Sequence, residues 1–241
     1  MKVELTPAFV LHQRPYRENS ALLDVFSEQY GRVSIVAKGL NQKRANKAGL
    51  LQLYQPLLLS WFGHGDLYTL TAVEALSARY ILQADAALCG LYMNELIVRL
   101  LGTHVAEPDV FNAYQQALFS LHQRDNTQII LRLFEKKLLG HLGYGLVLDS
   151  EYESGQLIED QRQYYYQADA GLLRWQQGVS LPMISGRSLR HLINESDFDQ
   201  QSLQEIKRVM RTVIYFYLGG KPLQSRQLFI DLQQYASESM G

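Results

Sequence analysis

The chain has 241 residues with a formal net charge of −1, and 47% of its residues are hydrophobic while 20% are charged. Its 6 prolines and 17 glycines are too few for a disordered or collagen-like chain, and its length suffices to bury a large core. The single cysteine, Cys89, can form neither an internal disulfide nor a cysteine-rich zinc site, which favours a reducing compartment. We therefore expect one large domain or two smaller ones.

No segment has the composition of a signal peptide or a membrane span. The first residues, Met1 to Glu4, lack an apolar stretch, and the longest uncharged run, 48–65, contains two glutamines, a proline and a histidine. We expect a soluble, cytoplasmic protein.

Charge is unevenly distributed along the chain. The net charge is +3 over residues 1–80, −2 over 81–150, −4 over 151–200 and +2 over 201–241. No acidic residue occurs from position 29 to position 65, a span that holds five cations: Arg32, Lys38, Lys43, Arg44 and Lys47. An acid-free stretch of this kind suits a polyanionic partner, and a solvated basic loop without a partner is the alternative.

The first 80 residues alternate apolar and polar side chains in short runs, which is the pattern of half-buried strands. Strands are predicted over 9–13, 21–27, 32–38, 53–62 and 67–76, with residues 39–49 as a basic, polar loop. Five short strands in about 75 residues favour a five-stranded oligonucleotide-binding barrel (OB-fold), and a small SH3-like barrel is the alternative.

Beyond residue 80 the apolar residues recur with the period of a helix. Helices are predicted over 87–101, 110–122, 128–142, 185–193, 202–218 and 224–235, with a small hairpin at 163–167 and 171–175. Asn126 is placed to cap the third helix, and Gly219-Gly220 ends the fifth. The prediction is an α+β chain, with an all-β OB domain at 1–80 and a mostly helical domain at 81–241 that is irregular around 146–182.

No set of residues has the spacing of a catalytic or metal site. The glycines of 140–145 follow a helix rather than a strand, and Pro222 occupies the Ser/Thr position of a P-loop after Gly219-Gly220-Lys221. His64 and Asp66 are close in sequence but have no further histidine or aspartate near them. We therefore expect no enzymatic activity and no cofactor, and a hydrolase that depends on His64 or Asp66 is a weaker alternative.

Motifs along nearly the whole chain resemble, in the expected order, those of the bacterial DNA repair protein RecO family. They are AFVLHQRPYRENS at 8–20, LDVFS at 23–27, VAKG at 36–39, QPLLL at 55–59, LYMNEL at 91–96, LLGHLGYG at 138–145 and YLGGKPLQSR at 217–226. Each motif alone is weak, but their combination in this order is specific.

The resemblance implies a recombination mediator with an N-terminal OB-fold barrel and a helical C-terminal domain. It implies binding to single- and double-stranded DNA, annealing of complementary strands, and a role in DNA damage repair and recombination through the RecFOR pathway. The implied partners are RecR, RecF (indirectly) and the acidic, hydrophobic C-terminal tail of the single-strand binding protein, in loading the RecA recombinase. Many members carry a four-cysteine zinc module where residues 146–182 here have no cysteine, so the chain resembles a zinc-free branch and we expect no metal.

Candidate DNA-binding residues flank the first predicted strands and fill the loop after the third. Cations there can contact phosphates and give an affinity that depends on salt but not on sequence. The candidates are Arg14, Tyr16, Arg17, Arg32, Lys38, Lys43, Arg44 and Lys47. Tyr16, Tyr54 and Trp61 are aromatic residues that can stack on bases, and packing in the core is the alternative, favoured more for Trp61 than for Tyr16.

Candidate partner-binding residues lie among the apolar helices near the C-terminus. A basic border around an apolar groove suits an acidic, hydrophobic peptide, and simple exposure to solvent is the alternative. The candidates are Lys207, Arg208, Arg211, Lys221 and Arg226. The prediction for the whole chain is a mediator without covalent chemistry, and the alternative is a protein-interaction adaptor with little DNA affinity.

Overall fold

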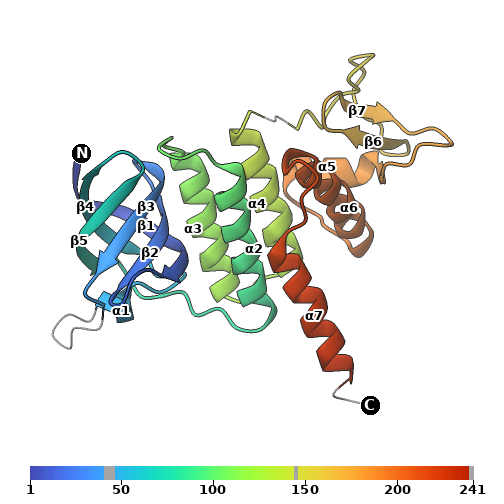
Figure 1. Cartoon of the computed structure of the whole chain (residues 1–241). Coiled ribbons are helices and arrows are strands. Elements are labelled where there is room, and N and C mark those ends of the chain that lie inside the picture. Colours follow the sequence, from blue (N-terminus) through green and yellow to red (C-terminus); the bar gives the residue numbers. More distant parts are fainter. Residues whose placement is uncertain (41–46, 144–145, 239–241) are drawn as a thin grey trace. The chain divides into compact units, whose positions relative to one another are not determined.

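The computed structural model describes residues 1–40, 47–143 and 146–238. Its contacts divide the chain into two compact units, unit 1 (Met1–Arg124) and unit 2 (Asp125–Gly241). Figure 1 shows the strands at the start of the chain and the helices that follow them. Strands give way to helices near residue 80, as predicted, whereas the compact units are divided after Arg124.

Unit 1 begins with a closed barrel of five strands. The strands are β1 (Lys2–Pro15), β2 (Ser20–Ser27), β3 (Gly31–Lys38), β4 (Leu57–His64) and β5 (Leu67–Ala75). Their order around the barrel is β1-β2-β3-β5-β4, with β1 closing against β4 and only the β3–β5 pair parallel. The predicted five-stranded OB-type barrel is confirmed.

The first strand is much longer than the predicted 9–13, because it extends back through Pro7 to Lys2 and continues to Pro15. β1 pairs with β4 from Lys2 to Ala8 and with β2 from Ala8 to Pro15. Pro7 therefore lies where β1 changes partner, and its carbonyl still accepts a hydrogen bond from the Glu28 amide. A missing amide hydrogen is tolerated at such a position, since no ladder bond on the β2 side requires it.

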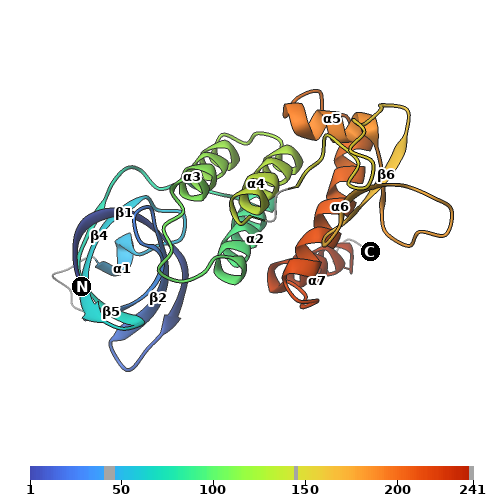
Figure 2. The ribbon, with the colours of Figure 1, turned by 90° about the horizontal axis from the view of Figure 1, so that it is seen from above.

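Inward side chains from every strand form the core of the barrel. Five of these side chains are fully buried and belong to one apolar cluster: Val10, Val25, Ile35, Leu59 and Trp61. A short helix, α1 (Lys47–Leu50), occupies the end of the segment predicted as a loop. In Figure 2 it is seen within the ring of strands. Leu51, which follows it, belongs to the apolar cluster, and Leu50 at its end packs against that cluster.

Two helices of unit 1, α2 (Asp85–Leu100) and α3 (Pro108–His122), cover part of the outer surface of the barrel. Phe9 and Phe26, which are paired on β1 and β2, face outward and stack against Phe111 and Tyr114 of α3. These apolar rings on the outer surface explain why α3 belongs to the same compact unit as the barrel.

Unit 2 combines helices with a sheet of three strands. Its elements are α4 (Thr127–His141), β6 (Gln163–Gln167), β7 (Gly171–Arg174), β8 (Met183–Ser185), α5 (Gly186–Asn194), α6 (Gln200–Tyr217) and α7 (Gln224–Glu238). The Asn126 side chain accepts hydrogen bonds from the amides of Gln128 and Ile129, as the predicted cap of α4 requires. The hairpin was predicted, but β8, which pairs with β6 on its other side, was not.

Within the described ranges, no helix is long and apolar enough to cross a membrane.

Candidate nucleic-acid interface

The turn between β1 and β2 and the end of β3 form one basic end of the barrel. The Gly39 amide donates to the Asn19 carbonyl at 2.8 Å, and Ser20 is paired with Lys38 across the ladder. Arg14 and Lys38 are exposed there. Hydrogen bonding between the two segments thus brings together candidates that the sequence separates by about twenty positions.

An aromatic and a cation share the β1–β2 turn. The Arg17 guanidinium lies 5.3 Å from the centroid of the Tyr16 ring, within the range of a cation–π contact. The Arg17 backbone has φ 55°, which the tight turn imposes. Glu18 is exposed in the same turn and reduces its net positive charge.

The acid-free segment continues from this basic end. Lys43 and Arg44 lie outside the described residues, so their predicted DNA contact stays a prediction. Lys47 begins α1 and is partly exposed, and its carbonyl accepts from the Leu51 amide at 3.0 Å.

Arg32 lies at the opposite end of β3 from Lys38. The separation of six positions between them corresponds to roughly 20 Å along the strand. Arg32 is partly buried, and burial lowers the pKa of its guanidinium while Asp24 acts in the opposite sense. Its carbonyl accepts from the His104 amide at 2.9 Å. The structure therefore does not bring Arg32 together with Arg14, Arg17 and Lys38.

Strand register places further side chains beside these cations on the outer surface. Arg14 is paired with Leu22, and Leu22 with Val36. None of the three belongs to the apolar cluster inside the barrel, whereas their sequence neighbours Ala21, Leu23 and others do. Val36 is only 5% exposed, so the partly exposed Leu22 is the apolar side chain that a single strand can reach beside Arg14.

The cross-strand pairs next to Arg14, Leu22 and Val36 form a second row of outward side chains, and this row contains an acidic residue. Asp24 is paired with His12 on β1 and with Ser34 on β3. The His12 Nδ1 is 3.7 Å from the Asp24 carboxylate, and the Ser34 hydroxyl donates to it at 3.5 Å. A phosphate is repelled from this row, which directs an anionic strand toward the row of Arg14.

The three candidate aromatics have different environments. Trp61 is 0% exposed inside the barrel, and Tyr54 is buried at 6% with its hydroxyl donating to the Ala87 carbonyl. These two rings pack in the protein and have no face open to a base, so core packing is the correct alternative for both. Tyr16 is partly exposed in the β1–β2 turn, and its stacking on a base stays a prediction.

Three of the candidate partner-binding cations lie on one helix of unit 2. Lys207, Arg208 and Arg211 are exposed on α6, whose opposite side buries Ile206 and Met210. Lys221 and Arg226 follow the Gly219-Gly220 turn, and both interact with other residues of the chain. Lys221 is exposed like the three cations of α6, whereas Arg226 is partly exposed.

A small apolar pocket opens beside these α6 cations. Its volume is about 140 Å³, and it is lined by Tyr166, Gln167, Ala168, Asp169, Leu181, Thr212, Val213 and Phe216. Thr212 lies one helical turn beyond Arg208, to whose carbonyl its hydroxyl donates at 3.1 Å. The pocket has the size for one apolar side chain, and Asp169 is the acidic residue in its lining.

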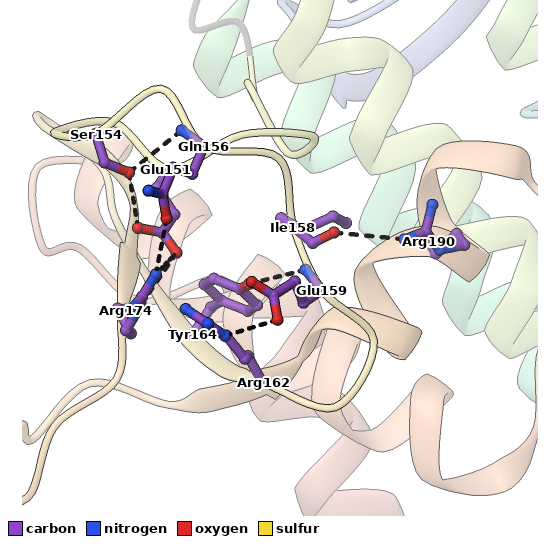
Figure 3. A network of polar contacts seen from close by, with 9 residues as sticks. All are labelled: Glu151, Ser154, Gln156, Ile158, Glu159, Arg162, Tyr164, Arg174 and Arg190. Carbon is purple, nitrogen blue, oxygen red and sulfur yellow. Dashed lines mark hydrogen bonds and ion pairs between the residues drawn. The ribbon is translucent and has the colours of Figure 1, made fainter.

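Polar contacts hold together the segment 150–190, which includes most of the cysteine-free stretch 146–182 (Figure 3). Arg174 donates to one Glu151 carboxylate oxygen at 2.7 and 3.1 Å, and Ser154 donates to the other at 2.8 Å. Burial alone raises the pKa of Glu151, but the bonds from Arg174 and Ser154 outweigh it and hold this pKa below its ordinary value. A nearby pair, Arg190 and Asp160, is 2.6 Å apart.

No group of three metal-ligating side chains occurs in the part of the chain that the structure describes. His64 is exposed, and Asp66 lies 3.8 Å from His104 rather than beside His64 in a larger cluster. Cys89 is partly buried on α2 rather than part of the core.

A closed five-stranded barrel with the strand order β1-β2-β3-β5-β4 is the OB fold, which many nucleic-acid-binding proteins share. The comparisons specify the family. The model "Recombination protein O N terminal" matches residues 1–79, and "Recombination protein O C terminal" matches residues 82–227.

Full-length relatives agree with this match. The chain is 43% identical over 240 residues to DNA repair protein RecO of Nitrosococcus oceani, covering 99% of this chain and 98% of that one. It is 40% identical over 229 residues to RecO of Coxiella burnetii (94% and 98% covered) and 39% identical over 230 residues to RecO of Aliivibrio salmonicida (95% and 97%). The chain belongs to the RecO family of DNA repair proteins.

Proposed function

We propose that this chain binds single- and double-stranded DNA at the basic end of its barrel, anneals complementary strands, and helps load the RecA recombinase onto DNA coated by single-strand binding protein. The observation that carries the proposal is the convergence of Arg14, Arg17 and Lys38 with Tyr16 on one exposed end. Membership of a DNA repair family supports the same conclusion.

Annealing follows from charge neutralisation and proximity rather than from covalent chemistry. Two strands bound near the same basic end lose part of their mutual repulsion, because the cations replace condensed counterions. Tyr16 can hold an unpaired base by stacking until its complement arrives. The proposal therefore assigns no catalytic residue and no metal.

Unit 2 is proposed to recruit partners. The apolar pocket beside Arg208 and Arg211 fits one apolar side chain of an acidic peptide, and the cations fit its carboxylates. We propose that this surface binds the C-terminal tail of single-strand binding protein. RecR, and RecF through it, complete the proposed set of partners, and DNA repair at the nucleoid is the proposed setting.

The experiment measures fluorescence anisotropy of a labelled oligonucleotide across a salt series. One variant replaces Arg14, Arg17 and Lys38 with alanine, and a second replaces Lys43, Arg44 and Lys47. Each phosphate contact that is lost should reduce the slope of log K against log salt by about 0.7 on a single strand and about 0.9 on a duplex.

A matched control removes the same number of charges elsewhere. Arg79, Arg124 and Arg187 are exposed cations outside the basic end, and the variant with alanine at all three should keep the wild-type slope. Equal slopes in all four proteins, or no binding at low salt, would contradict DNA binding at the barrel and leave the adaptor hypothesis. Capture of an acidic, apolar peptide that weakens with Arg208→Ala and Arg211→Ala tests the recruitment surface independently.

A further inference from the structure

The row of outward side chains that begins at Arg14 continues around the barrel. Val36 is paired with Thr69 on β5, Thr69 with Phe62 on β4, and Phe62 with Lys2 on β1. The complete row is Arg14, Leu22, Val36, Thr69, Phe62 and Lys2, in which Val36 is only 5% exposed and the other five side chains are exposed or partly exposed. We call it the barrel row. It starts near one end of β1 and returns to β1 at the other.

Phe62 is the aromatic residue of the barrel row. Its side chain is 52% exposed, whereas its neighbour Trp61 is 0% exposed and faces the core. The alternation of the strand thus presents a phenyl ring on the outer surface of the barrel, where no packing within unit 1 buries it. An exposed aromatic ring on a strand surface is the feature that stacks on an unpaired base.

The neighbours of Phe62 favour contact with bases over contact with phosphates. Thr69 beside it is partly exposed and carries a hydroxyl. Lys2 on its other side forms an ion pair with Glu4, which neutralises the positive charge there. The cations of the barrel row therefore lie at the Arg14 end, with Lys38 in the next row, and the aromatic ring lies at the other end.

Acidic groups border the barrel row without belonging to it. Asp24 lies in the adjacent row, and Asp66 lies exposed in the β4–β5 turn near His104. The path of least repulsion for an anionic strand therefore follows the barrel row itself. From Arg14 to Phe62 it crosses four strand spacings, roughly 19 Å.

We propose that Phe62 stacks on a base of a single strand that runs along the barrel row from the basic end. This inference rests on the proposed DNA binding at that end and adds a contact on β4 that serves unpaired strands only. At about 3.4 Å per stacked nucleotide the row accommodates roughly six nucleotides. Such a contact lets the protein distinguish single strands from duplexes, because the bases of a duplex are already stacked on one another.

The experiment compares Phe62→Ala with Phe119→Ala, since Phe119 is another exposed phenylalanine of unit 1, also 52% exposed. Anisotropy is measured with an oligothymidylate of about 16 nucleotides and with a duplex of the same length. Phe62→Ala should weaken single-strand binding by roughly 5- to 100-fold, the range of base–aromatic stacking, and leave duplex binding unchanged. Its salt slope should equal that of the wild type, because no charge is removed.

Rescue and fold are checked with the same proteins. Phe62→Trp should restore single-strand affinity, because an indole stacks as well as a phenyl ring. Trp61 emission reports whether the barrel of Phe62→Ala remains folded. Unchanged single-strand binding in Phe62→Ala, or equal losses on single strand and duplex, would overturn this inference. If Arg14→Ala and Lys38→Ala lose DNA binding while Phe62→Ala binds single strands as the wild type does, the proposed DNA binding at the basic end stands and the stacking contact of Phe62 does not.

Discussion

Asn94 on α2 illustrates how one buried side chain secures a helix to the barrel. Its amide nitrogen donates to the Leu11 carbonyl at 2.9 Å, and its oxygen accepts from the Tyr114 hydroxyl at 2.6 Å. Leu11 is the residue at which the β1–β2 register shifts, so the ladder leaves it without a paired residue. Asn94 therefore compensates for an irregularity of the barrel and joins α2 to α3.

Asn94→Ala should lower the free energy of unfolding of unit 1 by about 1–3 kcal/mol, because it removes a hydrogen-bond partner from two buried groups. Tyr114→Phe, which removes only the hydroxyl, should lower the free energy of unfolding of unit 1 by about 1 kcal/mol. The chain has two tryptophans, Trp61 in unit 1 and Trp175 in unit 2. Urea unfolding followed by Trp61 emission in a Trp175→Phe background measures unit 1 within the full chain.

The control for this prediction is Asn112→Ala, because Asn112 is exposed on α3. Asn112→Ala should leave the free energy of unfolding of unit 1 unchanged. Equal midpoints for Asn94→Ala and Asn112→Ala would show that the buried hydrogen bonds of Asn94 do not stabilise unit 1.

The lowered pKa of Glu151 predicts that the stability of unit 2 depends on pH. This pKa is lowered in the folded state by Arg174 and Ser154 against the opposing effect of burial. The stabilisation is therefore fully present above the unfolded pKa of about 4.3 and is lost as the pH falls through the folded pKa. Asp199 and Glu205, whose pKa values are also lowered, act in the same direction.

Glu151→Gln should reduce the loss of stability between pH 5 and pH 3, since it removes one of these three contributions. Trp175 emission in a Trp61→Phe background follows this unit, and Glu153→Gln, an exposed neighbour, is the control. A pH profile of Glu151→Gln that coincides with the wild-type profile would contradict the stabilising role of the Glu151–Arg174 pair.

At the scale of elements, local patterns predicted much of the fold. The alternation in residues 21–27 and 32–38 corresponds to β2 and β3 within one residue at either end. The predicted cap at Asn126 located the start of α4 correctly. The extent of β1 and the presence of β8 could not be predicted, because both depend on pairing with strands distant in sequence. β8 has only three residues, too few to show a period.

Close packing at the β2–β3 turn predicts a large difference between two glycines. Gly31 and Gly65 both have positive φ, 63° and 69°. A Cβ atom at Gly31 would lie 1.8 Å from the Val105 carbonyl oxygen, whereas one at Gly65 would meet no atom within 4 Å. Gly65→Ala should lower the free energy of unfolding by about 1–2 kcal/mol, the strain of the left-handed conformation.

Gly31→Ala should have a larger effect than Gly65→Ala, because the segment around Val105 must also move away from the barrel. Urea unfolding of the two variants, monitored by Trp61 emission, tests this order. Equal effects in the two variants would mean that the close approach of Val105 does not constrain the turn.

At the scale of the whole molecule, the sequence located the charge but not the surface. An acid-free segment and the β1–β2 turn were recognisable from composition, and hydrogen bonding joins their described parts at one end of the barrel. The barrel row was not recognisable, because Arg14, Thr69 and Phe62 become neighbours only through strand register and closure. The sequence favoured core packing more for Trp61 than for Tyr16, but it did not separate Tyr54 from Tyr16, since burial depends on the finished barrel.

The charge distribution also predicts which variants lose strand annealing. The alanine variant at Arg14, Arg17 and Lys38 should anneal complementary oligonucleotides several-fold more slowly than the wild type, because fewer phosphates are neutralised. The variant at Arg79, Arg124 and Arg187 should anneal at the wild-type rate. A fluorescence-quenching assay with labelled complementary strands measures both, and equal rates would contradict the role of the basic end.

The central claim is that DNA lies on the barrel, and hydrogen exchange of the full chain with and without a single-stranded oligonucleotide tests it most directly. We predict slower exchange at the β1–β2 turn and along β3, β4 and β5, with no change in α6. Protection confined to α6 and the sheet of unit 2, with the barrel unchanged, would contradict the claim.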